Sequence, residues 1–173
     1  MRNMFLIMIL CAVVWSCSED DNPLSSEMGS GDDYEIYTKI LMTEPRENNY
    51  LIILRDTTEH GYIDSFYVAN IREKSPELLD QTVNDFNSKN ESSIKLKIIS
   101  GIENVVWKSE YKGDGKNTVK ITLSRVGYGA SNTQALVTIG AVYAPLAGSG
   151  HLFYLKKENG EWRIINKLMT WIS

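Results

Sequence analysis

The chain has very little cysteine and histidine. Its 173 residues include two cysteines, Cys11 and Cys17, and two histidines, His60 and His151. Because no cysteine follows position 17, the body of the chain can form no internal disulfide, no thiolate metal site and no cysteine nucleophile. A tight zinc site takes three or four protein ligands, which two histidines do not supply. The sequence therefore predicts no metal and no other cofactor.

Positive charge is also in short supply. The chain has 18 lysines and arginines against 22 acidic residues, a net charge of −4. Proteins that bind nucleic acids use clustered lysine and arginine to neutralise phosphates. A mildly acidic chain therefore argues against a nucleic-acid partner.

Long apolar runs are missing except for one near the start. The run Met4–Val14 follows Arg2 and contains no charged residue. It is too short to span a bilayer, which takes roughly 20 apolar residues. Its length and the preceding arginine are typical of a secretory signal peptide.

The run ends in Val14-Trp15-Ser16-Cys17, which resembles a lipobox. The pattern has an aliphatic residue, then a small residue directly before the cysteine that receives the lipid, although Trp15 is bulkier than usual. Cys11 is a poorer cleavage position because no small residue precedes it. We therefore predict a signal peptide over residues 1–16 and lipidation of Cys17, which would hold the protein on a membrane.

Residues 17–31 follow as the lipidated cysteine and a polar segment rich in serine and glycine, which we expect to be a flexible tether. Ser18 beside the lipidated cysteine is typical of sorting to the outer membrane of a Gram-negative bacterium. The acidic residues 19–21 resemble a surface-export signal, with a solvated linker as the alternative. A single domain is expected over residues 32–173.

Helical spacing dominates the first part of that domain. Ile36, Tyr37, Ile40 and Leu41 share a helical face after Asp32-Asp33, and Pro45 should end this helix. A second helix is expected to begin at Ser75-Pro76-Glu77. Residues 56–74 are ambiguous, with 66–68 either a strand or a helical turn.

Strand patterns dominate the rest. Asn159-Gly160 between two alternating runs predicts a tight hairpin with Trp162 facing the core. In the last strand, Trp162, Ile164, Leu168 and Ile172 should share one face, and Ile165, Met169 and Trp171 the other. The segments with strand character are 50–54, 94–98, 105–107, 119–123, 133–144, 152–157 and 162–172. This order predicts an α+β fold, with N-terminal helices packed on one face of a curved, mostly antiparallel sheet that ends in a meander.

The C-terminal part also resembles a known group. Leu123–Tyr128, Thr133–Val137, Gly148–Gly150, Lys157–Trp162 and Met169–Ser173 resemble segments of a family of uncharacterised bacterial exported proteins and lipoproteins. This resemblance covers residues 118–173 well and residues 75–100 loosely, and it implies no activity. The Asn-Gly-x-Trp hairpin also resembles the cystatin-like or NTF2-like folds, which implies helices packed into a cone-shaped antiparallel sheet.

Arg125, Ser149 and His151 are the candidates for a ligand site. Arg125 interrupts an alternating strand, where it could bind an anion or pair with a nearby acid or carbonyl. Residues 145–150 are expected to be a glycine-rich loop. Ser149 would need a base and an orienting acid to act as a nucleophile, and His151 would point the same way in a strand.

Two further sets of residues are weaker candidates. His60 could form a metal site with Asp56 and Asp64, but its surroundings favour an exposed turn. Six aromatic residues could line a pocket or simply form core: Trp107, Tyr128, Tyr143, Tyr154, Trp162 and Trp171.

The function we favour from the sequence is a non-catalytic binding or interaction module on a lipid anchor. The partner is a protein or small molecule that the sequence does not identify. One alternative is a small-molecule enzyme of the cystatin-like type that uses Asp56 or Asp64 in a pocket. Another is a periplasmic inhibitor or immunity-type protein that blocks its partner through an exposed sheet edge.

Overall fold

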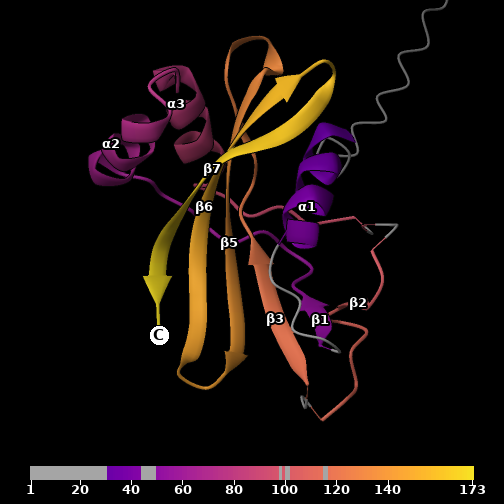
Figure 1. Ribbon diagram of the computed structural model, residues 1–173. Coiled ribbons are helices and arrows are strands. Elements are labelled where there is room, and N and C mark those ends of the chain that lie inside the picture. Colours follow the sequence, from indigo (N-terminus) through magenta and orange to yellow (C-terminus); the bar gives the residue numbers. More distant parts are fainter. Residues whose placement is uncertain (1–30, 44–49, 98, 100–101, 115–116) are drawn as a thin grey trace, which may run out of the picture.

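The structure is a computed structural model that describes residues 31–43, 50–97, 99, 102–114 and 117–173 (Figure 1). The predicted signal peptide, Cys17 and nearly all of the tether lie outside these residues, as do Pro45 and Ile98. The regular elements are α1 (Gly31–Thr43), β1 (Leu51–Leu54), α2 (Ser65–Lys74), α3 (Asp80–Lys89), β2 (Val105–Trp107), β3 (Thr118–Leu123), β4 (Gly127–Tyr128), a short 3₁₀ turn (Ala130–Asn132), β5 (Gln134–Ala144), β6 (Ala147–Glu158) and β7 (Glu161–Ile172).

The strands form one seven-stranded mixed sheet in the order β2-β1-β3-β5-β6-β7, with β4 beside β5. Strand β1 is parallel to both of its neighbours, and all other pairs are antiparallel. The α+β class and the C-terminal meander are therefore as the sequence predicts.

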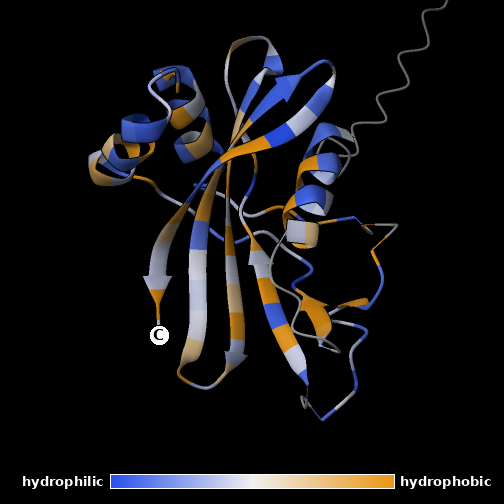
Figure 2. Cartoon of the chain, in the orientation of Figure 1, coloured by the Kyte–Doolittle hydropathy of each residue, from blue (hydrophilic) through white to orange (hydrophobic). Residues whose placement is uncertain are grey.

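The helices lie on both faces of this sheet, whereas the sequence analysis placed them on one. Along β5, Ala135 and Val137 belong to the core that includes Tyr37 of α1, while Leu136 belongs to the core that includes Phe86 of α3. Successive strand residues point to opposite faces, so α1 covers one face, and α2 and α3 cover the other. We call these the α1 face and the α2–α3 face. Figure 2 shows the hydrophobic side of α1 turned toward the sheet.

Capping contacts explain why α2 forms where the sequence was ambiguous. One carboxylate oxygen of Asp64 accepts hydrogen bonds from the backbone N–H groups of Phe66 at 2.9 Å and Tyr67 at 3.3 Å. This side chain satisfies two of the free donors at the helix start, so residues 66–68 are helical. None of the helices in the described ranges is both long and apolar enough to cross a membrane.

The expected helix start at Ser75 is wrong. The Ser75 N–H instead donates to the Ile71 carbonyl at 2.9 Å and ends α2, and α3 begins only at Asp80. Contacts from side chains outside the turn hold the turn between the two helices. The Arg72 guanidinium donates to the Leu78 carbonyl, and the Leu79 N–H donates to Gln134 at 3.1 Å. Side chains outside the segment therefore override a good local helix signal.

Two strand expectations also need correction. Ile94 and Leu96 are buried as their alternation requires, but the described residues 94–97 make an isolated bridge between Lys95 and Thr57 and no regular strand. Conversely, residues 148–150 are not a loop. They belong to β6 and pair with residues 140–142 of β5, because the β5–β6 hairpin closes earlier than the glycines suggest.

The β6–β7 hairpin confirms the predicted Asn159-Gly160 turn, with φ angles of 53° and 86°, and Trp162 is fully buried. The facing pattern of β7 differs from the expectation. Its register with β6 shifts at Ile165 and again at Thr170. Each such bulge inserts one residue and reverses the alternation. Leu168 consequently contributes to the α2–α3 face, whereas Trp162 and Ile164 lie on the α1 face.

Candidate functional site

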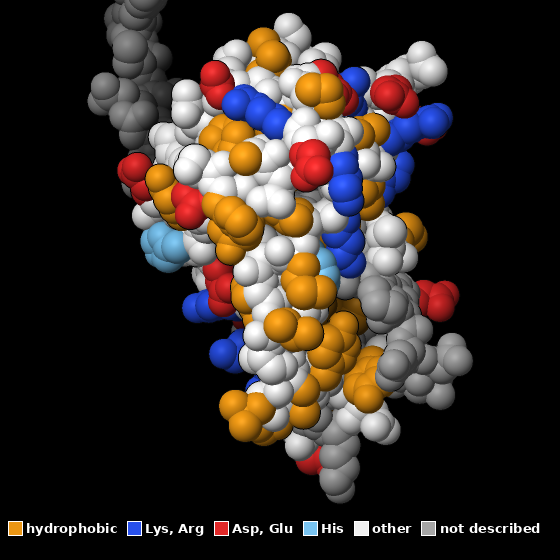
Figure 3. Space-filling model, turned by 60° about the vertical axis from the view of Figure 1, so that its left-hand side comes forward, with side chains coloured by type: hydrophobic (Ala, Val, Ile, Leu, Met, Phe, Trp, Pro, Cys, Tyr) orange, Lys and Arg blue, Asp and Glu red, His pale blue; other side chains and the backbone are white. Residues whose placement is uncertain are grey.

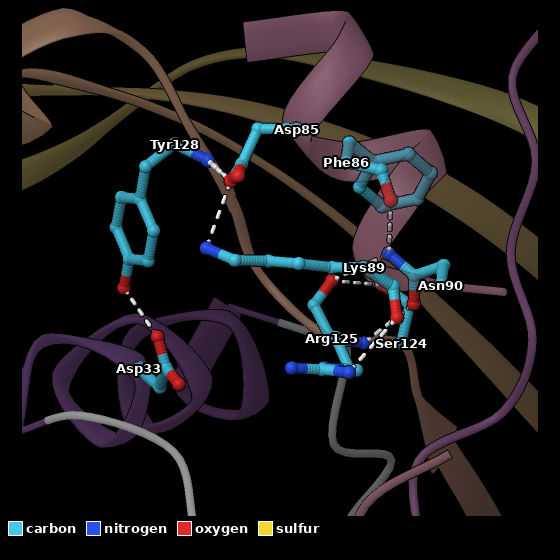
Figure 4. Close-up of polar contacts among 8 residues, drawn as sticks. All are labelled: Asp33, Asp85, Phe86, Lys89, Asn90, Ser124, Arg125 and Tyr128. Carbon is cyan, nitrogen blue, oxygen red and sulfur yellow. Dashed lines mark hydrogen bonds and ion pairs between the residues drawn. The ribbon is translucent and has the colours of Figure 1, made fainter. Parts of the chain in front are cut away.

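Arg125 joins the end of β3 to the C-terminal end of α3. Its Nη1 atom donates to the Lys89 carbonyl at 3.1 Å and to the Ser92 hydroxyl at 3.0 Å. Its backbone N–H donates to Asn90 Oδ1 at 2.8 Å, and its carbonyl accepts from Asn90 Nδ2 at 3.0 Å (Figure 4). A guanidinium bound to the last carbonyls of a helix is a favourable cap. The geometry therefore fits the strand-end alternative better than an anion site.

A second polar cluster links α1, β4 and α3 (Figure 4). The Tyr128 hydroxyl donates to Asp33 at 2.5 Å, and the Tyr128 N–H donates to Asp85 at 2.6 Å. Lys89 Nζ lies 2.8 Å from Asp85 and 4.9 Å from the centre of the Tyr128 ring. Both carboxylates thus tie the short strand β4 to helices. The sequence analysis missed this cluster because Asp33 and Asp85 lie 95 and 43 positions from Tyr128.

Ser149 and His151 lie on the α1 face of β6, so the expectation that they point the same way is confirmed. Their paired neighbours on the adjacent strands are apolar. Ser149 is paired with Ala141 and Ile172, and the His151 ring centre is 6.4 Å from that of Phe153. None of these neighbours is a carboxylate that could orient His151 as a base. The described strand pairings of Ser149 and His151 thus give no support to a serine nucleophile with its triad.

The residues of the hypothetical metal site have separate structural roles. Asp64 caps α2, and His60 Nδ1 lies 3.2 Å from the Asn90 carbonyl. Asp56 accepts hydrogen bonds from the N–H of Ser109 at 3.1 Å and from its hydroxyl at 2.5 Å. Within the described part of the chain, no group of three or more histidine, cysteine or acidic residues could hold a metal ion.

Asp56 does line a cavity of about 570 Å³, together with Trp107 and the segment 95–97. This cavity gives the enzyme alternative a structural candidate. However, both carboxylate oxygens of Asp56 are hydrogen-bonded to Ser109. These bonds hold the carboxylate in place, which suits a structural role.

A different pocket, of about 340 Å³, opens on the α2–α3 face. The segment 59–63 and Tyr67 of α2 form one side, and the end of β7 forms another. The Tyr67 hydroxyl donates to the Thr170 carbonyl at 3.1 Å, which connects these two sides. The polar and aromatic side chains that line the pocket include Glu59, His60, Tyr62, Tyr67, Thr122, Ser124, Thr138, Thr170 and Trp171.

Trp171 lies on a floor of three glycines at one end of this pocket. Gly140 and Gly150 are direct partners across β5 and β6, and Gly148 is on the same face. A Cβ atom would come within 3.2 Å of the indole at Gly148 and within 3.3 Å at Gly140, and at Gly150 it would overlap the ring. Only glycines leave room for both rings of the indole to lie across the sheet.

The Trp171 side chain nevertheless remains 42% exposed. Tyr62 and Phe66, at 75% and 66%, are exposed near the start of α2. Figure 3 turns the side of the molecule that carries α2, α3 and β7 forward, and hydrophobic side chains are exposed on it. Because soluble proteins seldom leave such groups of large apolar side chains in water, we take the pocket beside Trp171 as the candidate site.

The sequence carried a weak signal for this site. Trp171 was among six aromatic residues considered for a pocket, but the glycines were assigned to a loop. The signal that could have located it is the alternation Gly148-Ser149-Gly150 inside a strand, because it leaves two positions on one face of the sheet without side chains.

A scan of protein-family models finds no match to this chain, and comparisons with curated protein sequences and with solved structures also find none. The resemblance to exported lipoproteins and to cystatin-like folds therefore stays an expectation.

Proposed function

We propose that this protein is a lipid-anchored, non-catalytic binding module of the bacterial cell envelope. Its binding surface is the pocket on the α2–α3 face that Trp171 borders. The observation that carries this proposal is the half-exposed indole of Trp171 on its floor of Gly140, Gly148 and Gly150. Because these three positions carry no side chain, the large indole ring of Trp171 can lie across the sheet beside the pocket.

The anchor is part of the same proposal. The lipobox ending in Cys17 would fix the chain to the membrane through the acyl chains of the lipidated cysteine, and residues 17–31 would act as a tether. Ser18 favours the outer membrane as the location. A tethered domain meets its ligand at the cell envelope and needs no membrane-binding face of its own.

The sheet-edge alternative has less support. Strand β7 is an edge strand, and an edge can accept an added strand from a partner. Its bulges at Ile165 and Thr170 leave only a short regular stretch between them. Bulges of this kind are a usual way to protect an edge from pairing.

Cell fractionation tests the anchor. Full-length protein should be found with membranes, and Cys17→Ala should yield uncleaved precursor or protein released from membranes. Ser18→Ala is the matched control and should leave membrane association unchanged. Mature protein that still fractionates with membranes after Cys17→Ala would contradict lipidation.

Fluorine NMR tests the binding surface. The full-length chain is labelled with 5-fluorotryptophan and kept in a detergent without sugar groups. Two probe classes are then titrated, neutral oligosaccharides and a proline-rich peptide. A saturable shift of the Trp171 resonance with either class supports a binding module, and no shift with both contradicts it. Trp107 and Trp162 serve as internal references, because neither borders this pocket.

A further inference from the structure

We infer that the ligand of this surface is a neutral carbohydrate, with one sugar ring stacked on the indole of Trp171. This inference rests on the proposed binding function and names its ligand class. It draws on the shape of the platform, the chemistry of the pocket wall and the charge of the lining residues.

Shape restricts what can contact Trp171. Contacts at Gly140, Gly148 and Gly150 reach both rings of the indole, so the ring lies along the sheet and its exposed side is broad and flat. A ligand that covers such a surface must itself present a flat, weakly polar face. The C–H face of a pyranose ring, a proline ring and an aromatic ring all have this property.

The pocket wall next to the indole is formed by hydroxyl groups. Thr122 Oγ1 would lie 2.7 Å from a Cβ atom at Gly140, so this hydroxyl stands directly beside the floor of the indole. Thr138 Oγ1 lies close to Gly61 in the same pocket, and Thr170 adjoins Trp171 in β7. Each hydroxyl can both donate and accept hydrogen bonds, which matches the hydroxyls of a sugar.

A polyproline segment is a weaker match. Its recognition depends on grooves lined by successive aromatic side chains. Here the sheet between Trp171 and the segment 59–63 carries threonines instead, and the Tyr67 hydroxyl is already bonded to the Thr170 carbonyl. An apolar peptide would therefore leave threonine hydroxyls without water or partners.

The charge of the lining residues disfavours acidic ligands. The described residues that line the pocket include no lysine or arginine, and the carboxylate of Glu59 is bonded to Arg55 at 2.7 Å. Phosphate, sulfate and uronate groups would find no lysine or arginine to pair with there, and His60 is the one described lining side chain that could carry a positive charge. The volume of about 340 Å³ is at the small end of the ligand-pocket range. It suits a short stretch of neutral saccharide.

The test uses the labelled full-length chain described above, with five probes: cellohexaose, xylohexaose, mannohexaose, maltohexaose and chitohexaose. At least one should shift the Trp171 resonance saturably while those of Trp107 and Trp162 stay in place. By calorimetry, Trp171→Ala should weaken that binding by at least about tenfold, as expected when a central aromatic contact is removed. Trp171→Tyr should retain part of the affinity because it keeps a flat ring.

Met169→Ala is the matched control. Met169 lies in the same strand with 53% exposure, but the bulge at Thr170 places it opposite His151 and thus on the α1 face. This change should alter binding by less than about twofold. Melting curves of each variant establish that it is folded, and the wild-type NMR shift tests the inference without any substitution.

The outcomes separate the two proposals. If the proline-rich peptide shifts Trp171 and none of the saccharides does, the binding module stands and the carbohydrate inference is overturned. If neither class shifts it, both fail. A saccharide that binds Trp171→Ala and wild type equally overturns the inference, because its site is then elsewhere.

Discussion

Asn90 holds the backbone of Arg125 from both sides. Its Oδ1 atom accepts the Arg125 N–H at 2.8 Å, and its Nδ2 atom donates to the Arg125 carbonyl at 3.0 Å. The buried side-chain amide of Asn90, at the end of α3, thus pairs with the backbone of the segment between β3 and β4. This contact fixes the helix against the sheet.

Asn90→Ala should therefore lower the free energy of unfolding by at least about 2 kcal/mol, because it leaves buried backbone groups without partners. Urea denaturation measures this loss. Asn84→Ala is the control, since Asn84 is exposed on the same helix and its removal should cost less than about 0.5 kcal/mol. Equal midpoints for the two variants would refute the role given to Asn90.

Gly127→Ala should destabilise the protein by about 1–3 kcal/mol through overpacking. A Cβ atom at Gly127 would overlap the backbone of Phe86, because β4 and α3 are in direct contact there. Gly31→Ala tests the specificity, since a Cβ atom at that position would meet nothing within 4 Å. Gly127→Ala should melt at a lower temperature than Gly31→Ala. Similar melting temperatures would mean that α3 can move away from β4 at little cost in free energy.

Gly160→Val should cost more than about 1 kcal/mol, because a β-branched residue is strained at positive φ. Nothing lies within 4 Å of a Cβ atom at Gly160, so the cost would be conformational rather than steric. Gly160→Asn should be tolerated, since asparagine adopts this conformation more readily. If the Gly160→Val and Gly160→Asn variants have the same melting temperature, the stability of the turn does not depend on its backbone angles.

Stability should decline in alkali as buried tyrosines ionise. Burial raises the pKa of the Tyr154 hydroxyl, and nearby Glu77 raises it further. The folded state thus keeps this proton to higher pH than the unfolded chain, whose tyrosines have pKa values of about 10. The stabilising contribution is complete below about pH 10 and is lost as the pH rises through the folded-state pKa.

Tyr154→Phe should reduce this alkaline decline without loss of stability at neutral pH. The Tyr154 hydroxyl makes no hydrogen bond to any described group. Tyr37→Phe is the contrasting variant. Burial also raises the pKa of Tyr37, but its hydroxyl donates to the Ser124 carbonyl at 2.9 Å, so this change should cost about 1 kcal/mol at neutral pH. Urea denaturation at neutral and alkaline pH would show whether the two variants differ in this way.

A chelator should leave the melting temperature unchanged. The chain beyond Cys17 has no cysteine, and its described residues bring no three potential ligands together. A metal present at 100 times its dissociation constant would add about 2.7 kcal/mol, which is readily detected. A drop of several degrees with EDTA, reversed by one specific metal, would make His60 and His151 the first residues to substitute.

The sequence by itself determined the features that depend on neighbouring residues. The Asn159-Gly160 turn follows from two residues that tolerate positive φ between alternating strands. The face that α1 buries follows from the spacing of Ile36, Tyr37, Ile40 and Leu41. Together with the strand alternation after residue 117, these patterns were enough to predict an α+β fold with a C-terminal meander.

Tertiary structure alone decided the candidate site. The bulge at Thr170 places Trp171 and Met169 on opposite faces, although their spacing of two predicts the same face. The floor under Trp171 combines Gly140 with Gly148 and Gly150, which meet only because β5 and β6 pair in one register. Residue patterns report the backbone within a few positions, whereas bulges, register and helix placement depend on contacts between distant segments. The surface on which function is proposed is therefore a property of the assembled sheet.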